Sequence, residues 1–245
     1  MNAICVIPAR LESTRLSRKL LREIAGKPII QYVYENARKA KKPSRVIIAC
    51  DHPVLEKAVR AFGGEVMMTS AKHQSGTERL TEVAEKTKAD LFLNLQADEP
   101  LMHPSVVDDL ITAMELNTDY VMATACMRMD DEENFHNPNV VKVVKNHKDE
   151  ALYFSRSPIP YDRDKVDHSF FKHLGIYVYT RDFLLTIQSL KPSALEKREK
   201  LEQLRVLDNG FSIKVLETAY DSIGVDVEED LRKVEKIILE KQGKN

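Results

Sequence analysis

The stretch Ile4-Cys5-Val6-Ile7-Pro8-Ala9-Arg10 places a short apolar run directly before a charged loop. A run of this kind indicates a buried strand, which the proline ends. The loop carries Arg15, Arg18 and Lys19 in addition to Arg10. Ligands of open α/β sheets bind beyond the carboxyl ends of the strands, and Arg and Lys side chains pair with phosphate oxygens. The stretch is therefore consistent with a loop that binds a polyphosphate, and equally with a solvated basic loop.

The rest of the chain alternates apolar runs with helical patterns. Strands are predicted near residues 45–50, 66–68, 91–95, 120–125 and 211–217. Helices are predicted over residues 29–37 and 55–62, around 77–84, from 104 onward, over 193–209 and around 231–239, and residues 129–137 are expected to be irregular. This alternation predicts an α/β fold with a parallel sheet and right-handed crossovers. The helix over 193–209 is expected to begin with a capping box of Ser193 and Glu196.

One segment departs from this alternation. Residues 140–144 and 151–154 surround a polar turn and predict an antiparallel hairpin. After a loop that contains two prolines, residues 171–179 alternate in polarity. His173 and Tyr177 are expected on the same face of this strand, because an even number of positions separates them.

Size and composition favour a single soluble globular domain. The chain has 245 residues, of which 43% are hydrophobic and 31% charged, values that fit one α/β domain. The net charge of -1 provides no basic field, so nucleic acid is not an expected partner. The three cysteines are widely spaced and form no CxxC motif, which argues against a disulfide framework or a zinc site. No leader pattern or long apolar segment is present, so neither export nor membrane insertion is expected.

Two adjacent acids follow the most apolar strand of the chain. Residues 91–95 lead into Gln96-Ala97-Asp98-Glu99-Pro100. Acids at the carboxyl end of a buried strand are costly unless a cation neutralises them, and carboxylate oxygens are the ligands that Mg²⁺ prefers. The alternative is an acid in the turn before the next helix. Asp226 precedes the final helix, and its residue type and position alone predict an N-cap.

Three further positions have both a structural and a functional interpretation. Ser75-Gly76 begins a helix and offers backbone N–H groups to a ligand, although the pattern alone favours an ordinary N-cap turn. His173 is of a type that is more commonly a buried structural residue. Glu202 lies one turn before Val206, at the edge of the apolar face of its helix.

Several motifs together resemble one family over almost the whole chain. They are IPAR, STRL, IAGKPIIQYVYENA, SGTERL, QADEP, NVVKVV, ALYFSRSPIPY, KHLGIYVYTRDFL, LEQLRVLDNG and GVDVEEDL. The sequence is similar to those of the 3-deoxy-D-manno-octulosonate (Kdo) cytidylyltransferases. ALYFSRSPIPY, HLGIY and LEQLR are specific to this family among sugar nucleotidyltransferases, whereas the amino-terminal motifs are shared more widely.

The resemblance implies a Rossmann-like sheet of glycosyltransferase-A type in a single nucleotidyltransferase domain over residues 1–245. It implies an antiparallel excursion at about residues 138–190 for sugar binding and dimerisation, and hence a homodimer. The implied reaction transfers CMP from CTP to the anomeric hydroxyl of Kdo, with Mg²⁺ as cofactor and pyrophosphate as the second product. The resemblance places this reaction in lipopolysaccharide biosynthesis in the bacterial cytoplasm.

The resemblance also assigns roles position by position. The nucleotide would be bound by Pro8, Ala9, Arg10, Ser13, Lys19, Ser75, Gly76, Arg79 and Gln96. The sugar would be bound by Arg156, His173, Tyr177 and Glu202, with Arg156 as the expected partner of the sugar carboxylate. Asp98 and Asp226 would bind Mg²⁺, and with Arg10 and Lys19 they would form the catalytic set.

The phosphate loop departs from the family pattern. The usual Leu-Pro-Gly-Lys-Pro-Leu reads Leu16-Ser17-Arg18-Lys19-Leu20-Leu21 here, and Glu12, Glu78 and Ala97 also replace the usual residues. Losing both prolines and the glycine removes stiffness and a permissive backbone position. Because the charged contacts survive, activity is expected, and the consequences should fall on loop geometry and triphosphate affinity.

Two alternatives accompany this interpretation. The first is the same reaction on an amino-sugar analogue of Kdo or on another acid sugar such as sialic acid. The second is a degenerate nucleotide-binding protein without turnover, which the altered loop at Ser17 and Arg18 motivates.

Overall fold

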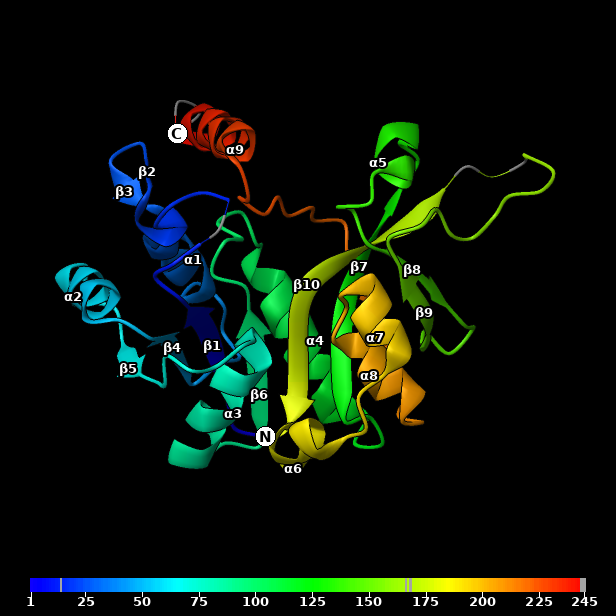
Figure 1. The fold of residues 1–245 in the computed structure, drawn as a ribbon, viewed down its shortest axis with the longest axis horizontal. Coiled ribbons are helices and arrows are strands. Elements are labelled where there is room, and N and C mark those ends of the chain that lie inside the picture. Colours follow the sequence, from blue (N-terminus) through cyan, green and yellow to red (C-terminus); the bar gives the residue numbers. More distant parts are fainter. Residues whose placement is uncertain (14, 166, 168, 243–245) are drawn as a thin grey trace.

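The computed structural model describes residues 1–13, 15–165, 167 and 169–242. In this part of the chain, the centre of the molecule is a nine-stranded mixed sheet (Figure 1). Its strands are β1 (Ala3–Ala9), β4 (Arg45–Cys50), β5 (Val66–Met68), β6 (Leu91–Leu95), β7 (Met122–Met129), β8 (Lys142–Lys145), β9 (Ala151–Ser155), β10 (Phe170–Thr180) and β11 (Ile213–Glu217). The central order is β11-β7-β10-β6-β1-β4-β5, and β8 pairs with β10 and β9. A separate pair consists of β2 (Glu23–Ile24) and β3 (Lys27–Pro28).

The predicted parallel pairing is present on both sides of the sheet. β1 pairs in parallel with β4 and β6, β4 with β5, and β7 with β11. Between these two groups, β10 runs antiparallel to both β6 and β7. The sequence pattern did not predict this direction, because a strand buried on both faces has the same apolar pattern whichever way it runs.

Helices cover both faces of the sheet. One face packs against α1 (Ile29–Ala37), α2 (Pro53–Ala61) and α4 (Pro104–Leu116), and the other against α3 (Gly76–Lys86), α6 (Arg181–Thr186) and α8 (Gln203–Asp208). The last helix, α9 (Glu228–Gln242), extends the first of these two cores and contacts β2. β1 serves both layers, since Cys5 and Ile7 belong to the first core and Ile4 and Val6 to the second. This two-sided burial confirms the strand that the opening stretch predicts. Among the described residues, no helix is both long and apolar enough to cross a membrane.

The single helix predicted over residues 193–209 is wrong. The segment forms α7 (Ala194–Glu199) and α8, separated by Lys200, whose backbone is left-handed with φ of 56°. A left-handed residue ends an α-helix, and a Lys there gives no clear sequence signal because Gly or Asn is the usual choice. The predicted capping box is confirmed, since the Ser193 side chain accepts from the Glu196 backbone N–H and the Glu196 side chain accepts from the backbone N–H of Ser193.

The segment predicted to be irregular contains a short helix, α5 (Glu132–His136). Its N-cap is Asp131, whose carboxylate accepts the Asn134 backbone N–H. The predicted hairpin is confirmed as the antiparallel pair β8 and β9. In Figure 1, the beginning of β10 extends away from the body of the sheet. The proposed role of residues 138–190 in dimerisation remains a prediction.

Candidate functional site

A cleft of about 900 Å³ opens beyond the carboxyl ends of β1 and β6. The side chains assigned to the nucleotide, the cation and the sugar come together here. The cleft is lined by Pro8, Arg10, Ser13, Lys19, Ser75, Gly76, Arg79, Gln96, Asp98, Arg156, His173, Tyr177, Glu202 and Asp226. Thr14, the second residue of the STRL motif, lies outside the described residues.

Ala9 is the one assigned residue that does not line the cleft. Its side chain is fully buried in the core shared with α1. The side chain of Ala9 therefore has a packing role, and a nucleotide contact at this position would have to come from the backbone.

The centre of the cleft is a cluster of opposite charges. The ammonium of Lys19 lies 2.5 Å from a carboxylate oxygen of Asp98 and 3.0 Å from one of Asp226. Arg15 contacts the other oxygen of Asp226 at 3.1 Å. Burial by itself would lower the pKa of Lys19, but the two carboxylates outweigh it and the net shift is upward. Lys19 is therefore a cation held between the two residues that were assigned to Mg²⁺.

The backbone explains how Asp226 reaches this cluster. The N–H of Val225 donates to the carbonyl oxygen of Asp98 over 2.9 Å. Val225 belongs to the segment between β11 and α9, which Figure 1 shows crossing above the sheet. The bond therefore holds this segment against the loop that follows β6. The N-cap predicted for Asp226 is wrong, because α9 begins at Glu228 and the Asp226 carboxylate accepts from Lys19 instead. A contact between residues so far apart in the sequence is invisible to pattern analysis.

The donor set fits a hard divalent cation. Two carboxylate oxygens already converge on one positive charge, which is the arrangement a bound Mg²⁺ requires. Mg²⁺ commonly takes one or two protein carboxylates and completes its shell with water and substrate phosphates. Accordingly, no group of three or more His, Cys, Asp or Glu side chains suited to a metal occurs within the described ranges.

Glu99, the second acid after β6, has a different environment from Asp98. The Ser222 hydroxyl donates to its carboxylate. Burial, and then the charge of Asp98, raise the pKa of Glu99 to about 7. Glu99 therefore ties the segment of Ser222 to the end of β6, while Asp98 faces Lys19.

Arg79 organises the nucleotide side of the cleft. Its guanidinium donates to the Thr69 hydroxyl at 2.5 Å and pairs with Asp51 at 3.4 Å. The other oxygen of Asp51 accepts the backbone N–H of Leu11 at 2.9 Å. This chain of contacts connects α3 to the loop after β1. Arg79 is almost fully buried, so much of its hydrogen-bonding capacity serves the position of that loop.

The start of α3 also faces the nucleotide side. Ser75 is the N-cap, and its hydroxyl accepts the Glu78 backbone N–H at 3.2 Å. The ordinary capping turn that the pattern favoured is therefore present. Because Ser75 and Gly76 also line the cleft, the same turn presents helix-terminal N–H groups to a ligand.

Arg156 is held from the opposite side by backbone oxygens. Its Nε donates to the Glu199 carbonyl at 2.7 Å and its Nη1 to the Pro138 carbonyl at 2.9 Å. The Glu199 carboxylate accepts the backbone N–H of Arg156 at 2.9 Å. Among the described residues, Nη2 has no acceptor, so a charged nitrogen remains to bind an anionic group.

His173 and Tyr177 lie together on one face of β10, as predicted. Their ring centroids are 5.4 Å apart. A bulge at Gly175 and Ile176 adds two residues between them relative to β7, and this even number preserves the shared face. The Nε2 atom of His173 lies 3.0 Å from the Thr124 hydroxyl, and burial lowers its pKa to about 3. His173 is therefore neutral at ordinary pH.

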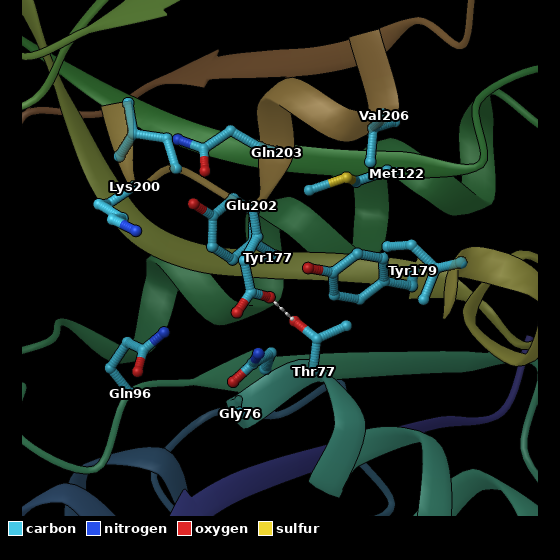
Figure 2. A pocket seen from close by; sticks show the side chains of 13 residues that line it. Gly76, Thr77, Gln96, Met122, Tyr177, Tyr179, Lys200, Glu202, Gln203 and Val206 are labelled. Carbon is cyan, nitrogen blue, oxygen red and sulfur yellow. Dashed lines mark hydrogen bonds between the residues drawn. The ribbon is translucent and has the colours of Figure 1, made fainter. Parts of the chain in front are cut away.

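A smaller hollow of about 200 Å³ continues from the cleft beneath Tyr177 and Glu202 (Figure 2). It contains the two buried side-chain atoms that have no hydrogen-bond partner among the described residues, Asn94 Oδ1 and Gln203 Nε2. Such atoms are costly unless a ligand or water pairs with them. Sequence analysis missed both residues. Gln203 could have been found as a candidate because it belongs to the LEQLR motif. Asn94 lies inside an apolar strand, and only its polarity marks it out.

Comparison with known proteins identifies the family of this chain. A family model described as cytidylyltransferase matches residues 4–217. The 3-deoxy-manno-octulosonate cytidylyltransferases of Geobacter metallireducens and Geobacter sulfurreducens are 49% and 48% identical to this chain. The matches cover 96% of this chain in both cases and 96% and 98% of the relatives. The chain belongs to the Kdo cytidylyltransferase family.

A solved member of the Kdo cytidylyltransferase family has the same fold. The structure of CMP:2-keto-3-deoxy-manno-octonic acid synthetase complexed with CTP matches with a TM-score of 0.94 and 43% identity, over 98% of this chain and 100% of that one. HddC from Yersinia pseudotuberculosis matches with a TM-score of 0.70 at 14% identity, over 97% of this chain and all of the other. At that identity, the second match concerns the fold alone.

The loop that departs from the family pattern has a left-handed residue at the position of the missing glycine. Arg18 stands where the family usually has glycine, and its φ of 49° and ψ of 38° are left-handed. Glycine adopts this conformation without the steric cost that a side chain incurs. Arg18 therefore adopts a conformation that glycine would adopt more readily, and Lys19 beside it lines the cleft.

The buried, neutral His173 predicts how stability depends on pH. A folded-state pKa of about 3, below the ordinary value of 6.5, means that only the unfolded chain takes up the proton below pH 6.5. The resulting stability is present above that pH and is lost as the pH falls toward 3. Between pH 7 and pH 5, we expect the free energy of unfolding to fall by about 2 kcal/mol more in the wild type than in His173→Gln. Urea titrations at both pH values measure the difference, and parallel losses in both proteins would contradict it.

Proposed function

We propose that the cleft binds CTP and Kdo on either side of the Lys19 cluster and joins them to give CMP-Kdo and pyrophosphate. The base and ribose lie toward Ser75 and Gly76, the triphosphate lies along the loop after β1, and the sugar lies toward β10 and α8. The observation that carries this proposal is the convergence of Lys19, Asp98 and Asp226 between the two halves of the cleft. The CTP-bound family member with the same fold supports the nucleotide assignment.

The reaction is an in-line substitution at phosphorus. The anomeric hydroxyl of Kdo attacks the α-phosphorus of CTP, a new P–O bond forms, and the bond from that phosphorus to the bridging oxygen breaks. Pyrophosphate leaves with the electron pair, and the proton of the attacking hydroxyl is lost to solvent. The positive charges of Arg10 and Lys19 stabilise the negative charge that develops on the leaving group, so catalysis consists chiefly of positioning and electrostatics.

Asp98 and Asp226 would hold Mg²⁺, as their two converging oxygens permit. When bound, the ion would supply charge beside the α-phosphate and lower the pKa of a coordinated hydroxyl. In the free protein, Lys19 neutralises the two carboxylates. Once the phosphates arrive, the flexible ammonium has a competing set of anionic partners within the same cleft, and we propose that it moves to them.

The sugar would be recognised by charge and shape together. The free Nη2 of Arg156 suits the Kdo carboxylate. Tyr177 and Glu202 offer hydroxyl and carboxylate partners for sugar hydroxyls, and the unpartnered amide of Gln203 extends that surface into the smaller hollow. Neutral His173 would contact the sugar without adding charge.

A pyrophosphate-release assay tests the proposed function. CTP and Mg²⁺ are combined with Kdo, its amino-sugar analogue or sialic acid. We expect turnover with Kdo. Turnover only with another sugar would reassign the substrate, and CTP binding with no product from any sugar would favour a nucleotide-binding protein without turnover.

The sugar assignment predicts a selective kinetic effect. Arg156→Ala and His173→Ala should each raise the apparent KM for sugar more than that for CTP, because both side chains line the cleft and are assigned to the sugar. His147→Ala, in the exposed turn between β8 and β9, is the matched control. Equal effects on both substrates would mean that Arg156 and His173 serve the fold or the nucleotide.

We also propose that the protein is a cytoplasmic homodimer that pairs through the excursion. Tyr161 is 87% exposed and Leu152 is 60% exposed there, and both are apolar enough to favour a protein interface. All three cysteines are free and buried, which suits a reducing compartment. Light scattering of the wild type and of the double variant Tyr161→Ser/Leu152→Ser tests the dimer. A wild-type protein that is monomeric in solution would contradict it.

A further inference from the structure

Thr77 makes a hydrogen bond that the proposed reaction leaves unexplained. It follows Gly76 in the first turn of α3, and its side chain is buried. Its hydroxyl donates to a carboxylate oxygen of Glu202 over 2.6 Å (Figure 2). The two residues are 125 positions apart in the sequence, so neither motif analysis nor local pattern reveals the contact.

This bond connects the two sides of the cleft. Thr77 belongs to the same helical turn as Ser75 and Gly76, on the nucleotide side. Glu202 is the N-cap of α8, on the sugar side, and its side chain makes no capping hydrogen bond. The carboxylate of Glu202 is thus available to the cleft, and its orientation is fixed from α3 rather than from its own helix.

The surroundings show why an external tether matters. Glu202 is an exposed residue with three side-chain torsions, and free rotation would spread its carboxylate over many positions. The Thr77 hydroxyl holds one oxygen and leaves the other to accept from a ligand. Tyr177 and Tyr179 lie near the Glu202 carboxylate. Burial raises the pKa of both phenols, and the negative charge of Glu202 raises both values further. Both hydroxyls therefore remain protonated next to the fixed carboxylate.

We infer that Thr77 is a positioning residue for sugar binding, which orients Glu202 from the nucleotide-binding helix. The inference rests on the proposed role of Glu202 in the sugar site. It predicts that removing the hydroxyl harms the sugar site selectively, although Thr77 lies next in sequence to residues assigned to the nucleotide.

The test compares substitutions that keep the volume of Thr77. Thr77→Val removes only the hydroxyl and should raise the KM for sugar about tenfold, as expected when a hydrogen bond to a charged group is lost. The KM for CTP and the melting temperature should change little. Thr77→Ser restores the hydroxyl and should recover most of the wild-type KM.

Thr81→Val is the matched control. Thr81 is buried one turn further along α3, and its hydroxyl bonds to the carbonyl oxygens of Thr77 and Leu184 rather than to a cleft residue. It reports the general cost of removing a buried threonine hydroxyl from this helix. The KM for sugar should not change in this variant.

Glu202→Gln completes a double-mutant cycle with Thr77→Val. If Thr77 acts through Glu202, the double variant should have nearly the same KM for sugar as Glu202→Gln alone. The inference would be overturned if the two substitutions raised the KM for sugar independently, so that their effects multiplied in the double variant. It would also be overturned if Thr77→Val raised the KM for sugar and the KM for CTP equally. Neither result would contradict the proposed sugar site. An unchanged KM in Glu202→Gln would instead contradict the proposed role of Glu202, and the inference would fall with it.

Discussion

Asp98→Asn and Asp226→Asn are each expected to lower the turnover number by roughly a hundredfold or more while the protein remains folded. Each change keeps the shape of the side chain and removes a negative charge. The two carboxylates converge on one point, where Lys19 now lies at 2.5 and 3.0 Å. With one charge removed, a divalent cation loses a principal protein ligand and the α-phosphate loses the charge beside it. Initial rates over a range of Mg²⁺ concentrations measure the effect.

Asp90→Asn is the control for this pair. Asp90 accepts the backbone N–H of Asn2 at 2.7 Å, away from the cleft, so its substitution reports the effect of an Asp-to-Asn change elsewhere in the chain. Melting temperatures of all three variants establish that they fold. Near-normal turnover of both cleft variants at saturating Mg²⁺ would show that Asp98 and Asp226 do not hold the metal.

Lys19→Ala is expected to lower the turnover number about a hundredfold or more, with a smaller effect on the KM for CTP. In the proposed mechanism, the ammonium acts chiefly as charge develops on the departing pyrophosphate, so its loss should affect the transition state more than the bound substrate. Lys19→Arg should recover only part of the rate, because a forked guanidinium places its charge differently from an ammonium. Steady-state kinetics on the three proteins measure both constants.

Arg18→Gly is the neighbouring comparison. Arg18 already has a left-handed backbone with φ of 49°, a conformation that costs most residues roughly 1–2 kcal/mol and costs glycine almost nothing. The substitution should therefore leave turnover close to normal. If Lys19→Ala turned over normally and Arg18→Gly did not, Arg18 would be the phosphate-binding cation and the alignment of this loop would be wrong.

Local sequence patterns predict most of the helices and strands, and the family motifs name most of the residues that line the cleft. The apolar run before Arg10 predicts β1, and Ser193 with Glu196 predicts the start of α7, because a strand or a cap depends on residues only a few positions apart. The cleft residues were found by their match to family motifs, and nearly all of them line one cleft. The local prediction is wrong at Lys200, where a left-handed backbone ends α7 without the glycine that usually marks such a point.

Which of these groups lie in contact depends on how the chain folds in three dimensions. Lys19 is 79 positions from Asp98 and 207 from Asp226, and Thr77 is 125 positions from Glu202. Such contacts depend on the order and direction of the strands, including the antiparallel β10 between β6 and β7. Periodicity records which face of an element is buried but carries no information about its neighbour. The pairing of Lys19 with two carboxylates and the tether on Glu202 therefore follow from the arrangement of the sheet, which brings distant chain segments to one edge.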